Sequence, residues 1–174
     1  PLAWLFAHPT VEALAARIVA SDAAGKNTAI PIVDRSGALP LSSDEQRLWL
    51  LHHALGDRST YNVPWAKRLR GPIEVERIRS ALAALSRRHE ILRTSYASRD
   101  GSLVREVHEA CSVSLKCSDL ERRQEETVEA ALDRCLQEEI SRPFDLESAP
   151  LLRVQCWRIA ADDHALVFVA HHII

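Results

Sequence analysis

The sequence predicts a mixed α/β domain, and three observations lead to that class. Helical periodicity recurs in several segments, alternating or fully apolar runs typical of strands lie between them, and their order is helix, strand, helix, strand pair, helix, strand, strand. The chain has 174 residues, of which 47% are hydrophobic and 26% charged, a globular balance that excludes disorder over most of its length. That size fits one domain of about 150 residues plus a short additional piece.

The first predicted helix covers residues 10–20, with Thr10 as its N-cap. Its apolar residues fall on one face: Val11, Leu14, Ala15 and Ile18. Residues 21–38 carry two glycines, a proline and small polar residues, which is the composition of a linker. We therefore expect a first unit over residues 1–22, a linker over 23–38 and a second unit over 39–174.

The second unit is predicted to begin with a helix over residues 43–55, capped by Ser42 or Ser43. A strand over residues 65–70 is closed by Gly71 and Pro72. The clearest helical pattern covers residues 73–89. Its apolar stripe is spaced 3, 4, 3, 4 and consists of Val75, Ile78, Leu82, Leu85 and His89.

A hairpin is predicted next, with strands over residues 91–97 and 103–107 around the turn signal Asp100-Gly101. The pattern of Ser118 followed by Glu121 resembles a capping box. It predicts the start of a long helix that runs to about residue 140 and ends before a proline.

Two strands close the sequence. Residues 151–159 alternate between apolar and polar side chains, whereas residues 165–171 are apolar on both faces, as expected for a buried central strand. Because this apolar stretch continues to Ile174 and the chain opens with Pro1 and an apolar cluster, we expect the chain to be a fragment of a longer polypeptide.

Composition excludes several classes of partner. The formal net charge is −2 without a basic block, so a nucleic-acid or anionic-membrane partner has no electrostatic support. No apolar run approaches the ~20 residues of a membrane helix, and no secretory signal is visible. The cysteines lack C-x-x-C spacing, so no metal site is expected, and we interpret them as reduced thiols of a cytoplasmic protein. They are Cys111, Cys117, Cys135 and Cys156.

The candidate catalytic residues are His171 and His172, at the end of the last predicted strand. Because side chains alternate along a strand, one ring can face a cleft while the other packs into the fold. An imidazole suits general-base or hydrogen-bonding work near neutral pH. Structural roles for both rings remain an alternative, and the adjacent His52 and His53 are interpreted as non-functional.

Arg93 is a second kind of candidate. It lies between Leu92 and Thr94 on a predicted strand. If the Leu92 side chain faces the core, the Arg93 side chain therefore points to the opposite face of the strand. A buried guanidinium there requires a carboxylate partner, and no nearby residue is an obvious one.

Four short stretches, in this order, resemble the N-terminal part of a nonribosomal peptide synthetase condensation domain. They are residues 39–51 (LPLSSDEQRLWLL), similar to S-x-A-Q-x-R-L-W-x-L; residues 88–96 (RHEILRTSY), similar to R-H-E-x-L-R-T-x-F; residues 142–153, which contain RPFDL and PLLR; and residues 171–174 (HHII), the opening of H-H-x-x-x-D-G. The aspartate and glycine of this last motif have no counterpart in the sequence. Residues 6–15 (FAHPTVEALA) resemble the last helix of an acyl or peptidyl carrier domain, of either the peptide or the polyketide type.

The resemblance implies a chloramphenicol-acetyltransferase-like fold, with this chain as an incomplete N-terminal lobe behind a short carrier helix. It implies amide bond formation between a donor acyl or peptidyl thioester and the amine of an acceptor aminoacyl thioester. It assigns catalysis to His172, support to His171, and to Arg93 an ion pair with the motif's aspartate. No cofactor is bound directly, because both substrates arrive on the 4'-phosphopantetheine arms of carrier domains, and the attachment serine is not in this sequence.

The implied partners are the upstream and downstream carrier domains and the adjacent adenylation domain of the same assembly line. Without a second lobe, the chain alone is expected to be inactive. The alternatives are an epimerisation domain, a related carrier-dependent acyltransferase, or a non-catalytic remnant of a broken synthetase gene.

Overall fold

The computed structural model describes residues 2–21, 33–34, 39–56 and 58–174, which belong to two compact units, residues 1–36 and 37–174. The first unit holds α1 (Ala3–Ala7) and α2 (Val11–Ala20). The Thr10 hydroxyl accepts a hydrogen bond from the Ala13 N–H at 3.2 Å, which confirms the predicted N-cap. The predicted linker, residues 23–38, lies outside the described residues apart from positions 33 and 34.

The second unit contains three longer helices, a 3₁₀ helix and seven strands among its described residues. In chain order they are β1 (Leu39–Pro40), α3 (Ser43–Ala54), β2 (Asn62–Arg70), α4 (Val75–Arg88), η1 (Glu90–Arg93), β3 (Thr94–Arg99), β4 (Ser102–Val107), β5 (Leu115–Asp119), α5 (Val128–Ser141), β6 (Leu152–Ala160) and β7 (Asp163–His171).

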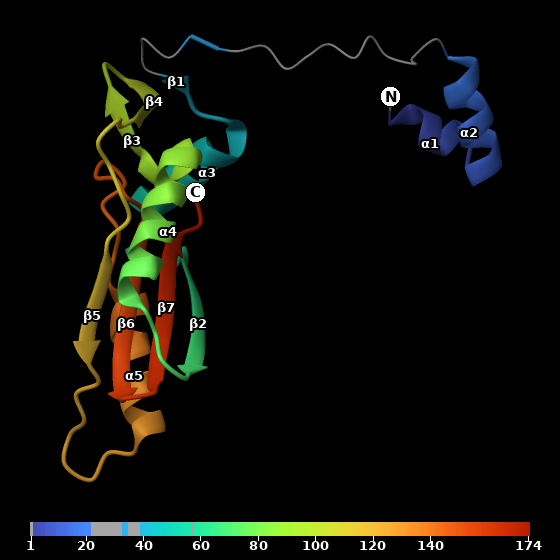
Figure 1. The fold of residues 1–174 in the computed structure, drawn as a ribbon. Coiled ribbons are helices and arrows are strands. Elements are labelled where there is room, and N and C mark those ends of the chain that lie inside the picture. The colour runs from blue at the N-terminus through green and yellow to red at the C-terminus, as the bar shows by residue number, and fades with distance from the viewer. Residues whose placement is uncertain (1, 22–32, 35–38, 57) are drawn as a thin grey trace. The chain divides into compact units, whose positions relative to one another are not determined.

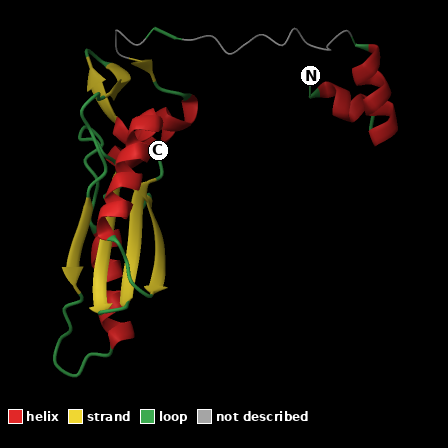
Figure 2. Cartoon of the chain, viewed as in Figure 1, coloured by secondary structure: helices red, strands yellow, loops and turns green. Residues whose placement is uncertain are grey.

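The strands form two sheets, as Figure 2 shows in yellow. The smaller sheet has the order β1-β4-β3, and its β3–β4 hairpin turns at Asp100 and Gly101 as predicted. Both turn residues have positive φ, which a glycine adopts without steric cost. The larger sheet has the order β2-β7-β6-β5, with all pairs antiparallel except β5 with β6.

The apolar strand β7 lies inside the larger sheet, between β2 and β6, and both of its faces are covered. On one face Leu166 packs in a cluster with Leu82 of α4, and on the other Val167 packs in a cluster with residues of α5. Figure 1 accordingly shows α4 and α5 on opposite sides of the sheet. The two-sided apolar pattern of residues 165–171 is thus explained by one helix on each face.

The helix predicted from Ser118 begins later. Ser118 lies in β5, a strand that the sequence patterns did not predict, and the helix starts at Val128 behind Thr127, whose hydroxyl accepts from the Ala130 N–H at 3.2 Å. The S-x-x-E pattern is misleading here because Ser118 pairs with Trp157 of β6 instead of capping a helix.

The apolar stripe predicted for residues 73–89 is also partly wrong. Leu82 and Ser86 are the buried residues of α4, whereas Leu85 is 46% exposed and His89 lies beyond the helix end. The Ser86 hydroxyl donates to the Leu82 carbonyl and accepts from the Val113 N–H. A hydrogen-bonded serine is therefore buried next to Leu82, where the predicted stripe placed Leu85.

Candidate active site

The two adjacent histidines lie where β7 ends. The ring of His171 is fully buried, whereas that of His172 is exposed, as the alternation of side chains predicts. After β7 the backbone turns: the Ile174 N–H donates to the His171 carbonyl at 3.1 Å, and the His172 N–H donates to the Tyr61 carbonyl at 2.9 Å. The turn therefore presents the His172 ring at the surface on a fixed backbone.

The ring of His171 makes two hydrogen bonds in the core. Its Nδ1 accepts from the Ile173 N–H at 3.2 Å, and its Nε2 lies 3.2 Å from Nδ1 of His52 on α3. The rings of Phe144 and Tyr61 lie beside it, each with its centroid 6.2 Å away. Burial lowers the pKa of His171 to about 4, with the neighbouring His52 and His172 acting in the same direction. His171 is therefore neutral at pH 7.

His52 is a site residue that the sequence patterns did not reveal. Its adjacency to His53 suggests a non-functional residue, yet it is only 2% exposed and contacts His171. The available signal is its spacing: Glu45, Leu48 and His52, spaced 3 and 4, are the buried residues of α3. Burial also lowers the pKa of His52 below its ordinary value.

A second buried cluster reaches the same turn. The hydroxyl of Tyr96 on β3 lies 3.1 Å from Glu45 Oε1 and 3.3 Å from the Ile173 carbonyl oxygen. Arg105 of β4 donates to the same Glu45 oxygen at 3.2 Å. Burial alone would raise the pKa of Glu45, but hydrogen bonds from Ser42 and the charge of Arg105 bring it below its ordinary value. The buried carboxylate is thus ionised and satisfied.

Arg93 does not lie on a strand, contrary to the prediction, because η1 occupies residues 90–93 and β3 begins only at Thr94. Nor does it lack partners. Its Nη1 donates to the His108 carbonyl at 3.0 Å, and its Nη2 lies 3.9 Å from a Glu90 carboxylate oxygen. Glu90 is not an obvious partner in the sequence, because the 3₁₀ turn that brings it back toward Arg93 has no clear sequence signature.

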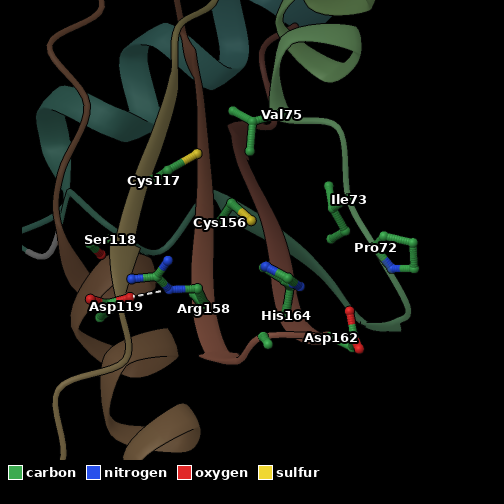
Figure 3. Close-up of a pocket in the computed structure, with 11 residues that line it drawn as sticks. Pro72, Ile73, Val75, Cys117, Ser118, Asp119, Cys156, Arg158, Asp162 and His164 are labelled. Atoms are coloured by element: carbon green, nitrogen blue, oxygen red, sulfur yellow. Dashed lines mark hydrogen bonds and ion pairs between the residues drawn. The ribbon is translucent and has the colours of Figure 1, made fainter.

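A cleft of about 680 Å³ opens at the other end of β7, near its first residues (Figure 3). Cys117 and Cys156 are paired on the neighbouring strands β5 and β6, and an ion pair joins Asp119 to Arg158. His164, which also lines the cleft, lies near the start of β7, seven residues before His171, so roughly 20 Å of extended strand separates the cleft from the histidine turn. The cleft is therefore a separate feature.

Within the described parts of the chain, no three His, Cys, Asp or Glu side chains are grouped so that they could hold a metal ion. No described helix is long and apolar enough to cross a bilayer.

Comparison with known proteins decides the family. A family model described as a condensation domain matches residues 35–174. The chain belongs to this family. Its relatives include tyrocidine synthase 3 of Brevibacillus parabrevis, which is 37% identical over 100% of the chain. The chain spans only 2% of the length of that relative.

Two solved structures share the fold of this chain. The X-domain from teicoplanin biosynthesis superimposes with a TM-score of 0.69 at 28% identity, over 83% of this chain and 30% of its own. The starter condensation domain of rhizomide synthetase gives a TM-score of 0.70 at 22% identity, over 79% of this chain and 33% of its own, and confirms the fold. The predicted chloramphenicol-acetyltransferase-like class is thus confirmed, and the chain spans about a third of each of these two solved chains.

Proposed function

We propose that this chain is the N-terminal part of a condensation domain that forms amide bonds between carrier-bound building blocks of a peptide synthetase. The observation that carries the proposal is the exposed ring of His172 on a turn held by the Tyr61 carbonyl and by the buried ring of His171. The family membership and the synthetase relatives support it.

The chemistry is acyl transfer. The amine nitrogen of the acceptor attacks the thioester carbonyl carbon of the donor, the C–N bond forms, the C–S bond breaks, and the amine loses a proton as the thiol of the donor carrier leaves. His172 accepts a hydrogen bond from this amine or takes its proton. General-base help is typically worth about 10²–10⁴-fold, and aligning the two reactants contributes as much or more.

Two further residues have supporting roles in this proposal. His171 fixes the turn from the core through the hydrogen bond that its Nδ1 accepts from the Ile173 N–H. Arg93 pairs with the aspartate of the family motif, for which this sequence has no counterpart. The contact between Arg93 Nη2 and the Glu90 carboxylate, at 3.9 Å, is long for a tight ion pair, so the guanidinium can still donate hydrogen bonds to a closer carboxylate.

The partners follow from the same proposal. Upstream and downstream carrier domains deliver both substrates on 4'-phosphopantetheine arms, and an adenylation domain loads them, all in the cytoplasm. Residues 1–22 are the end of the upstream carrier, 23–38 the linker, and 39–174 the condensation domain. The tyrocidine synthase relative aligns over 100% of the chain, which supports a synthetase origin for the first unit as well.

The test is product formation in the parent synthetase module with both carriers loaded. His172→Ala is expected to lower amide formation by about 10² or more. His53→Ala, which changes an exposed histidine on α3, is the matched control and should leave the rate unchanged. Equal rates for wild type and His172→Ala would contradict the catalytic role.

Other outcomes separate the alternatives. Inversion of an aminoacyl centre without a new amide would identify an epimerisation domain, and a wild-type module without any product would favour a non-catalytic remnant. The 174-residue chain mixed with two loaded carriers should give no amide, since it spans only about a third of the solved chains whose fold it shares.

A further inference from the structure

The contact between His52 and His171 joins a helix and a strand that are far apart in sequence. His52 Nδ1 and His171 Nε2 are 3.2 Å apart, and the ring planes cross at 77° with centroids 5.0 Å apart. His52 is 2% exposed and His171 is fully buried, so water cannot substitute for either partner.

The hydrogen-bond directions in this cluster follow from one backbone donor. The Ile173 N–H can only donate, so Nδ1 of His171 must hold a lone pair. A neutral His171 then carries its proton on Nε2 and donates it to Nδ1 of His52. His52 must in turn be neutral with its own proton on Nε2. The chain of contacts runs from the turn, through one ring, to the helix.

We infer that His52 is a positioning residue for the exposed histidine: it holds the buried ring of His171 in the tautomer that fixes the turn carrying His172. The catalytic part of this inference rests on the proposed function. Its structural part rests on the two hydrogen bonds of His171 alone.

The surroundings favour a neutral pair. A positive charge on His52 is disfavoured by its neighbours His53 and Arg58 and favoured by Asp145. A positive charge on His171 is disfavoured by His52 and His172. The aromatic rings of Phe144 and Tyr61 add no charge. If either histidine were protonated, both of its ring nitrogens would be donors, and the His171 ring would lose one of its two bonds.

The tautomer can be measured directly on the 174-residue chain by nitrogen-15 NMR of the imidazole rings at pH 7. We expect His171 to be neutral with its proton on Nε2. This measurement needs no variant, so it tests the inference even if a substitution prevents folding. A proton on Nδ1 of His171 would overturn the inference.

Three variants then test the coupling to the turn. His52→Leu removes the acceptor, His52→Asn retains an acceptor oxygen near the position of Nδ1, and His53→Leu is the matched control on the same helix. His52→Leu should speed hydrogen exchange of the Ile173 amide about tenfold, because the turn loses the stabilisation that a buried hydrogen bond typically provides. His52→Asn and His53→Leu should leave it near the wild-type rate. Unchanged exchange in a folded His52→Leu would overturn the inference.

The catalytic part is tested in the intact module with loaded carriers. His52→Leu should lower amide formation about tenfold, and His52→Asn should restore most of it. If wild type forms amide and His52→Leu forms it at the same rate, the positioning role is wrong. If wild type forms no amide, the proposed function is wrong, and so is the catalytic part of the inference. The tautomer measured by NMR then still tests whether His171 donates to His52.

Discussion

The hydroxyl of Tyr96 donates a hydrogen bond to the carboxylate of Glu45 at 3.1 Å, and both side chains are buried. Glu45 is also the N3 residue of a capping box, because its other oxygen accepts from the Ser42 N–H at 2.6 Å. One carboxylate thus caps α3 and holds β3. Since the Tyr96 oxygen also lies 3.3 Å from the Ile173 carbonyl, this pair connects the helix start to the turn that carries His172.

Tyr96→Phe should lower the free energy of unfolding by about 1–3 kcal/mol, because it leaves a buried carboxylate with one hydrogen bond fewer. Urea unfolding followed by tryptophan fluorescence measures the change. Tyr61→Phe, the same substitution at a half-buried ring, is the control and should cost less. An equal or larger loss in Tyr61→Phe would mean that the Tyr96–Glu45 bond contributes little.

The buried, neutral His171 predicts an acid-sensitive stability. Burial lowers the pKa of His171 from an ordinary value of 6.5 to about 4, so between these values the unfolded chain binds the proton more readily than the folded chain. Stability is therefore expected to fall as the pH drops from about 6.5 to about 4, by about 3 kcal/mol for the full shift. Urea unfolding at pH 7, 5 and 4 gives the slope.

The control is His171→Asn, which is expected to be less stable at pH 7 but to show a smaller dependence on pH across the same window. If the variant and wild type lose stability in parallel, another group accounts for the acid sensitivity.

Much of the fold could be predicted from local patterns. The two-sided apolar run at residues 165–171, the hairpin at Asp100-Gly101 and the caps at Thr10 and Ser42 follow from periodicity and turn chemistry within a few residues. Strand β5 could not be predicted in this way, because its first residue is buried and the other four are exposed, and only pairing with β6 makes it a strand.

In the candidate site, too, local patterns predict some features and not others. That one of two adjacent histidines is buried and the other exposed follows from alternation along a strand. The contact of His52 is with His171, which is 119 positions away, and no local pattern contains that information. Arg93 was misplaced for a similar reason, because a 3₁₀ turn and a strand differ little in the apolar pattern of four residues.

Asn62 offers a test of how α5 is held against the site. It pairs directly with His171 in the sheet, and its Nδ2 donates to the Ile140 and Arg142 carbonyls at 2.6 and 2.9 Å, at the end of α5. Carbonyls at the end of a helix lack partners within the helix, and that of Arg142, the residue after α5, also accepts from Arg153 at 2.8 Å. Asn62→Ala should therefore cost about 2 kcal/mol, and Asn62→Asp more, because a carboxylate would face carbonyl oxygens.

The control for Asn62 is Lys67→Ala, an exposed residue on the same strand, for which we expect a change within about 0.5 kcal/mol. Urea unfolding measures all three variants. A loss for Asn62→Ala no larger than that for Lys67→Ala would exclude the capping role.

The two cysteines that line the cleft near the start of β7 should differ in reactivity. Cys117 is exposed, whereas Cys156 is buried, and burial together with the adjacent Cys117 raises the pKa of Cys156 to about 11. Only the thiolate reacts, so roughly one Cys156 thiol in a thousand is reactive at pH 8, and burial hinders access further. Iodoacetamide at pH 8 should therefore label Cys117 well before Cys156, as mass spectrometry of peptides can show. In urea the two should react at similar rates. Equal labelling of both in the folded chain would contradict the burial of Cys156 in the cluster that contains Leu82 of α4.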